Sequence, residues 1–99
     1  MKVVKLIYID EYEPQFDTPY ITSIRGLDTI LSGVEEVKVY TSSLIVFVYF
    51  RVLIKRGIID NERSYVEYRG DKFYFDKSGR ADLLPDFDAL HMELLCELL

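Results

Sequence analysis

Residues 42–57, SSLIVFVYFRVLIKRG, constrain the fold more than any other segment of this chain. Seven consecutive apolar residues are followed by Arg51 and then by three more. A membrane-spanning helix needs about 20 apolar residues, and this segment has roughly half that number. We therefore expect it to be the central core element of a soluble domain, with the rest of the chain covering it.

The conformation of this segment has two interpretations. Its five β-branched residues favour a strand. Its length of a dozen residues favours a helix, because most strands are only about five or six residues long. Ser42 or Ser43 can cap the start of such a helix, and a basic pair before Gly57 can end it. We favour the helix, with Arg51 and Lys55 as its only polar edge; the alternative is two strands that turn near residues 41–43.

The segments before this core element predict a strand, a loop, a helix and a second strand. Residues 2–9 are almost continuously apolar, as in a central strand that is covered on both faces. An acidic, proline-containing stretch over 10–17 indicates a loop. Thr18 and Pro19 resemble a cap and a first-turn proline, so we expect a helix over about 19–32 that ends at Gly33. Residues 35–41 alternate as a half-exposed strand does, with Val37 and Val39 on one face.

Two runs after the core element, SYVEYR and KFYFDK, predict a β-hairpin. If Gly70 and Asp71 form a two-residue type II′ turn, Tyr68 pairs with Phe73 and Val66 pairs with Phe75. The apolar residues then share one face of the hairpin. The other face carries polar and aromatic residues, namely Tyr65, Glu67, Arg69, Lys72 and Tyr74.

A terminal amphipathic helix, spaced by Phe87, Leu90, Leu94 and Leu98, completes the expected fold. The order is β-α-β-α-β-β-α. At 99 residues the chain has room for one domain and no second. We predict a single α+β domain over residues 1–99, with a mixed sheet of roughly four strands and about three helices.

Composition narrows the possible partners. The net charge of −5 and the pI near 4.8 argue against a general affinity for nucleic-acid phosphates.

No targeting signal is recognisable at the start of the sequence, which predicts an intracellular protein. No cofactor motif is present: the chain lacks a glycine-rich phosphate loop, and neither His91 nor Cys96 has partners at metal-binding or catalytic spacing.

One weak pattern suggests an enzyme. Glu36 and Lys38 lie two apart on one strand face, and with an upstream Asp10 or Asp28 they resemble the metal-binding core of a broad nuclease superfamily. Such a triplet arises readily by chance. We therefore favour an exposed strand with alternating charge and keep a metal-dependent nuclease as an alternative.

The aromatic content is the composition feature that best supports binding. Eight Tyr and six Phe are many for one small domain, and tyrosine is favoured at interfaces because its ring is apolar while its hydroxyl stays wet. The outer hairpin face and the terminal helix are the candidate contact surfaces, for a protein partner or for self-association as a homodimer. A nucleic-acid binder that uses the basic residues is a further alternative, with Arg51, Lys55, Arg56, Arg69 and Lys72.

The length, the opening MKVVKLIYIDEYEPQFDTPYITSIRGLD and the thermophile-like composition resemble the small orphan proteins of archaeal filamentous DNA viruses of the lipothrixvirus and rudivirus type. Such families carry no assigned activity. The resemblance implies a thermostable, acid-stable viral accessory protein in the host cytoplasm. Combined with the residues above, it leads us to expect a non-enzymatic protein that binds a host or viral protein.

Overall fold

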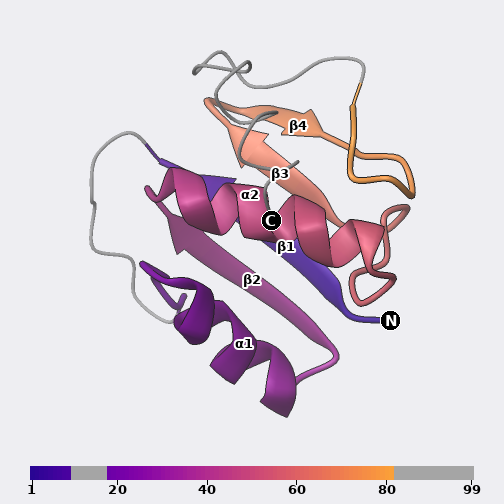
Figure 1. Cartoon of the computed structure of the whole chain (residues 1–99). Coiled ribbons are helices and arrows are strands. Elements are labelled where there is room, and N and C mark those ends of the chain that lie inside the picture. Colours follow the sequence, from indigo (N-terminus) through magenta and orange to yellow (C-terminus); the bar gives the residue numbers. More distant parts are fainter. Residues whose placement is uncertain (10–17, 82–99) are drawn as a thin grey trace.

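The computed structural model describes residues 1–9 and 18–81. This part of the chain contains two helices and four strands, of which the last two strands are consecutive (Figure 1). The elements, in chain order, are β1 (Val3–Tyr8), α1 (Ile24–Gly33), β2 (Glu36–Thr41), α2 (Leu44–Lys55), β3 (Tyr65–Tyr68) and β4 (Asp71–Phe73).

The strands form one mixed sheet in the order β2-β1-β3-β4. β1 pairs in parallel with both β2 and β3, whereas β4 is antiparallel to β3. The α+β class, the four-stranded mixed sheet and the central position of β1 are therefore confirmed. The expected acidic loop over 10–17 and the expected terminal helix lie outside the described residues.

The apolar segment is a helix, as favoured from its length and ends. The Ser43 side chain accepts a hydrogen bond from the Val46 N–H at the start of α2, which satisfies one of the free donors of the first turn. After Lys55 the chain leaves the helix through Gly57, whose φ of +75° suits a residue without a Cβ. Eight of the twelve residues of α2 are buried, so the helix is the centre of the domain.

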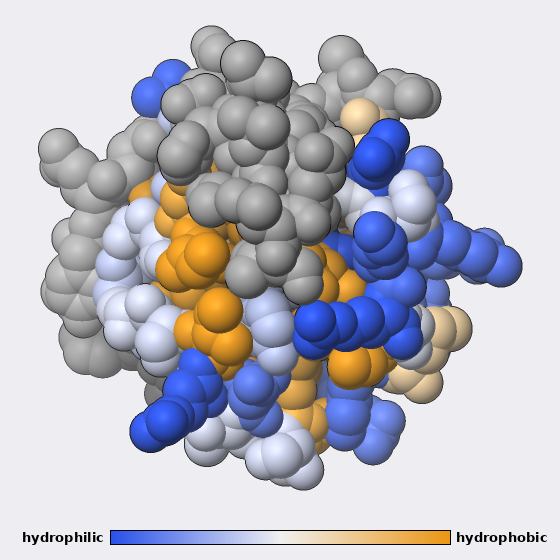
Figure 2. Space-filling model, in the orientation of Figure 1, coloured by the Kyte–Doolittle hydropathy of each residue, from blue (hydrophilic) through white to orange (hydrophobic). Residues whose placement is uncertain are grey.

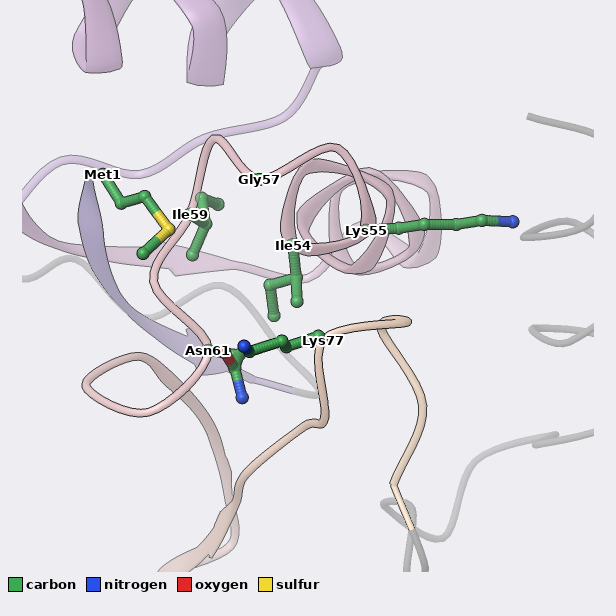
Figure 3. A pocket seen from close by; sticks show the side chains of 7 residues that line it. All are labelled: Met1, Ile54, Lys55, Gly57, Ile59, Asn61 and Lys77. Atoms are coloured by element: carbon green, nitrogen blue, oxygen red, sulfur yellow. The ribbon is translucent and has the colours of Figure 1, made fainter.

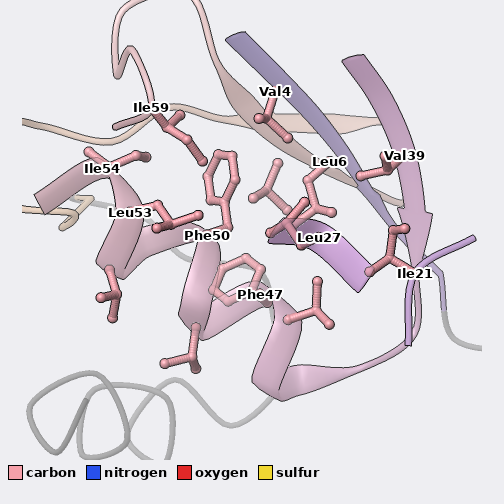
Figure 4. Close-up of a cluster of buried hydrophobic side chains, with 14 of the residues drawn as sticks. Val4, Leu6, Ile21, Leu27, Val39, Phe47, Phe50, Leu53, Ile54 and Ile59 are labelled. Atoms are coloured by element: carbon pink, nitrogen blue, oxygen red, sulfur yellow. The ribbon is translucent and has the colours of Figure 1, made fainter. Parts of the chain in front are cut away.

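The hydrophobic core lies between α2 and one face of the sheet (Figure 4). Phe47 and Phe50 of α2 point toward Val4 and Leu6 of β1, and Leu27 of α1 completes the same cluster. All five side chains are fully buried. Burying one such side chain stabilises the fold by about 1.5–3 kcal/mol, so this cluster contributes strongly to stability.

Arg51 differs from expectation. Instead of forming a polar edge with Lys55, it is completely buried, and only Lys55 is exposed. The Arg51 Nε donates a 2.7 Å hydrogen bond to the Gly79 carbonyl, and its guanidinium carbon lies 5.6 Å from the centre of the Phe75 ring. The segment after the hairpin therefore covers a side of α2 that the isolated helix would expose.

Helix α1 begins later than the sequence predicted. Residues 19–21 are extended and pair with the outer edge of β2: the Tyr40 N–H donates to the Pro19 carbonyl and the Ile21 N–H donates to the Tyr40 carbonyl, both at 2.8 Å. Ser23 is the true N-cap, and its hydroxyl accepts from the Gly26 N–H. Pairing with β2 therefore overrides the local helix signal of Thr18 and Pro19.

The hairpin exists, but its predicted register is wrong by two residues. Val66 pairs with Phe73 and Tyr68 pairs with Asp71, so the two-residue turn is Arg69-Gly70. Both turn residues have positive φ, 52° and 87°, as a type I′ turn requires. Phe75 is released from the hairpin and packs edge-on against Phe47 and Phe50, with ring centres 6.0 and 5.8 Å apart.

Two buried hydroxyl groups satisfy main-chain atoms that the sheet leaves unpaired. Ser64, just before β3, accepts a 2.9 Å hydrogen bond from the Val4 N–H of β1. Thr41, at the end of β2, donates to the Ile21 carbonyl and accepts from the Ser43 N–H. These contacts fix the connections on both sides of α2.

Candidate functional site

The second face of the sheet is the main candidate site. Because successive side chains of a strand point to opposite faces, the residues that alternate with the core residues project away from α2. In the described part of the chain, neither helix belongs to this side. We call it the open sheet face because no described helix packs on it, although Val3 and Ile7 at its centre are buried. Its residues are Val3, Lys5, Ile7, Glu36, Lys38, Tyr40, Tyr65, Glu67, Lys72 and Tyr74.

On the hairpin half of the open sheet face, two tyrosines and a lysine are in contact. The rings of Tyr65 and Tyr74 lie 5.6 Å apart. The Lys72 ammonium lies 4.9 Å from the centre of the Tyr65 ring, within the range of a cation–π interaction. Glu67 is directly opposite Lys72 in the ladder. The observed register therefore pairs Lys72 with an acid, whereas the predicted register placed it opposite Arg69.

The other half of the open sheet face is built by β1 and β2. Lys5 and Lys38 are directly adjacent in the parallel ladder, and Tyr40 is next to Ile7. The Lys5 ammonium forms a 3.4 Å ion pair with Glu36. Both partners are substantially exposed, so this pair adds at most about 1 kcal/mol to stability.

Four of the five hairpin residues proposed from the sequence lie on this face, and one does not. Tyr65, Glu67, Lys72 and Tyr74 share it, and Tyr74 is 52% exposed. Arg69 occupies the turn instead, with its guanidinium over the Tyr68 ring at 5.0 Å.

Lys5 and Tyr40 also contribute to this surface, and they were not among the residues predicted from the sequence. Their own strands alternate clearly, but only the parallel register of β1 with β2 shows that they continue the surface of the hairpin. Strand alternation could have placed each residue on a face, without showing which faces join.

The residues of the nuclease hypothesis are not brought together in the described part of the chain. Glu36 and Lys38 are exposed neighbours on the open sheet face, while Asp10 lies outside the described residues. Asp28 is on α1, on the helix side of the sheet, where it accepts a 2.7 Å hydrogen bond from the Tyr49 hydroxyl. Among residues 1–9 and 18–81, no group of three acidic, His or Cys side chains could hold a metal ion.

The basic residues considered for nucleic-acid binding are divided among three places. Arg51 is buried, which corrects its proposed role as a surface contact. Lys55 and Arg56 lie at the end of α2, and Arg69 and Lys72 lie in the hairpin. His91 and Cys96 lie outside the described residues.

A shallow pocket lies at the end of α2, with a volume of about 320 Å³ (Figure 3). Ile54, Ile59 and Met1 form its apolar walls, and the Lys77 side chain crosses it toward Asn61. Asn61 donates its side-chain N–H to the Phe75 carbonyl, and the Lys55 side chain extends away from the other lining residues. The pocket therefore has little polar chemistry with which to orient a ligand.

The helix side of the molecule also shows apolar surface between charged residues (Figure 2). Neither described helix is long enough or apolar enough to cross a membrane.

Comparison of the chain with protein-family models, with curated proteins and with solved structures found no match.

Proposed function

We propose that this chain is a non-enzymatic binding domain that docks a protein partner on the open sheet face. The proposal rests on one observation: the sheet joins the hairpin half of the open sheet face to the half built by β1 and β2. The Tyr65–Tyr74 pair and Lys72 continue through β1 into Tyr40, Lys5 and Lys38. In the setting that the viral resemblance suggests, the partner is a host or viral protein in the host cytoplasm.

The chemistry of this face suits a protein surface. Tyrosine side chains bury a large apolar area at low entropic cost, because each has only two rotatable bonds. Lysines and glutamates alternate around them, which resembles the polar rim of an interface. The four hydrogen-bonded strands hold these side chains on a rigid support, so little ordering is needed on binding.

A capture experiment with matched variants tests the proposal. The bait is the full chain, and the variant Lys38→Glu/Tyr74→Ala changes two exposed residues of the open sheet face. The control Lys55→Glu/Ile58→Ala makes a similar charge and size change at exposed residues near the end of α2. We expect a partner that is retained by the wild type and the control but lost from the face variant. Equal retention by all three baits, or no partner at all, would overturn the proposal.

A second candidate, binding of single-stranded nucleic acid, is favoured by one observation. Three tyrosines and three lysines interleave on the same sheet face, and bases stack on aromatic rings while ammonium groups contact phosphates. Glu36, Glu67 and the net charge of −5 oppose it. Binding of a labelled oligonucleotide that weakens steeply with salt, and that Tyr74→Ala reduces, would favour this candidate over the protein partner.

A further inference from the structure

The two edges of the sheet differ in whether another described segment pairs with the edge strand. At the β2 edge, the extended residues 19–21 hydrogen-bond to Tyr40. At the β4 edge, the Asp76 N–H donates to the Arg80 carbonyl at 2.8 Å, and β3 is the one described strand that pairs with residues 72–74, so their other side is unpaired in the described part of the chain. An unpaired edge is a template for another strand.

The direction of the main-chain groups follows from the hairpin register. In a two-residue hairpin, the residues beside the turn exchange both of their hydrogen bonds, and the next pair exchanges none. Tyr68 and Asp71 are the pair beside the turn. The N–H and C=O groups of Lys72 and Tyr74 therefore point away from β3, toward the outer edge, while those of Phe73 point inward.

We propose that a second copy of this chain pairs with this edge, β4 against β4 and antiparallel, about a two-fold axis at Phe73. In this register Lys72 of each copy lies opposite Tyr74 of the other. Each of these two pairs exchanges two main-chain hydrogen bonds, about four in all. The result is a continuous eight-stranded sheet with both open sheet faces on the same side.

The side chains favour this register over its neighbours. A lysine beside a tyrosine is favourable, as in the contact that Lys72 already makes diagonally with Tyr65 at 4.9 Å. A register with Lys72 opposite its own copy would place two ammonium groups together, which is destabilising. A shift by one residue would turn one sheet over relative to the other. The half-buried Phe73 would then lie on the same side as the open sheet face of the partner copy. A register centred on Tyr74 would place Lys72 opposite Asp76, whose N–H already donates to the Arg80 carbonyl. Pairing about Phe73 is therefore favoured, and the proposal does not depend on the proposed protein partner.

Cross-linking with single cysteines tests the register directly. In a Cys96→Ser background of the full chain, Lys72→Cys and Tyr74→Cys are prepared separately and also mixed under mild oxidation. Directly opposite residues have Cα atoms about 5.5 Å apart, which a disulfide can bridge. The self-paired positions are diagonal and farther apart, so we expect the mixed sample to give about tenfold more covalent dimer than either variant alone.

Sedimentation over a concentration series supplies an independent measurement. The wild type is expected to form a reversible dimer, and Tyr74→Pro is expected to remain monomeric because proline lacks the outward N–H group. Thermal unfolding of each variant verifies that the fold is kept. A wild type that stays monomeric up to the order of 1 mM would overturn the proposal. Equal cross-linking of Lys72→Cys alone and of the mixture would overturn it as well.

Discussion

Arg51 and Gly79 hold each other in place across the domain. The Arg51 Nε donates a 2.7 Å hydrogen bond to the Gly79 carbonyl. In return, Gly79 approaches the main chain of α2 so closely that a Cβ at this position would lie 2.5 Å from the Arg51 carbonyl oxygen. The turn after the hairpin is thus seated against the middle of α2 through one polar contact and one steric fit.

Replacing Gly79 should therefore destabilise the fold strongly. Gly79→Ala adds a Cβ both to a position with φ of +79° and to a contact with rigid main chain. We expect the free energy of unfolding to fall by about 3 kcal/mol, since backbone strain and overpacking combine. Urea denaturation measures the loss. Gly57→Ala is the matched control, because its φ of +75° is similar but its Cβ would meet nothing within 4 Å. The control should lose only about 1 kcal/mol, and equal losses in the two variants would contradict the steric argument.

Arg51 itself should be more sensitive to truncation than to loss of charge. Arg51→Ala removes the hydrogen bond to Gly79 and leaves a cavity between α2 and Phe75, so we expect a loss of about 3–5 kcal/mol. Arg51→Met keeps most of the volume and should lose about 1–3 kcal/mol, chiefly from the unsatisfied Gly79 carbonyl. Chemical denaturation of both variants distinguishes the two costs. A surface-like loss below about 0.5 kcal/mol for either variant would refute the buried position.

Ser64 should stabilise the junction of β1 and β3 through its hydroxyl. Its Oγ accepts the 2.9 Å hydrogen bond from the buried Val4 N–H. Ser64→Ala leaves this donor unsatisfied, and we expect a loss of about 1–3 kcal/mol in the free energy of unfolding. Ser32→Ala is a suitable control, because the Ser32 hydroxyl bonds the Thr29 carbonyl on the exposed side of α1. The control should change stability by no more than about 0.5 kcal/mol in either direction.

The turn over residues 76–80, which contains Gly79, should stabilise the fold less in acid. The Ser78 hydroxyl, followed by the N–H groups of Arg80 and Ser78, holds the pKa of Asp76 below its usual value of 3.8. A carboxyl group with a lowered pKa in the folded state stabilises that state above its unfolded pKa, and this stabilisation is lost as the pH falls through the folded value. Asp76→Ala should therefore lower the thermal midpoint at neutral pH, and in strong acid, below the lowered pKa of Asp76, this difference from the wild type should shrink. An unchanged difference at both pH values would exclude the carboxylate as its cause.

Local sequence patterns correctly predicted the helices and strands whose conformational preference agrees with their burial in the fold. The apolar run over residues 44–54, its serine cap and Gly57 all indicate a buried helix, and the structure has one. The alternation of residues 35–41 and the apolar run of residues 2–9 likewise placed the strands β2 and β1 correctly. In these segments, the residues that favour the local conformation are also the residues that the fold buries.

Local patterns failed where a distant segment competes for the same atoms. Thr18 and Pro19 carry a helix signal, yet residues 19–21 pair with Tyr40 because an open strand edge is available beside them. Arg51 reads as a surface residue, yet the Gly79 carbonyl and the Phe75 ring receive it. None of these three partners is near in sequence, so neither outcome could be predicted before the fold was known.

The sequence alone determined the kinds of element and the faces they bury, because side-chain periodicity depends only on local geometry. It could not decide the hairpin register, since a shift of two residues keeps Val66, Tyr68 and Phe73 on the same face. The tertiary structure decided that register by burying Phe75 against Phe47 and Phe50. It also decided the candidate site, because only the parallel pairing of β1 with both neighbours joins the hairpin tyrosines to Lys5 and Tyr40.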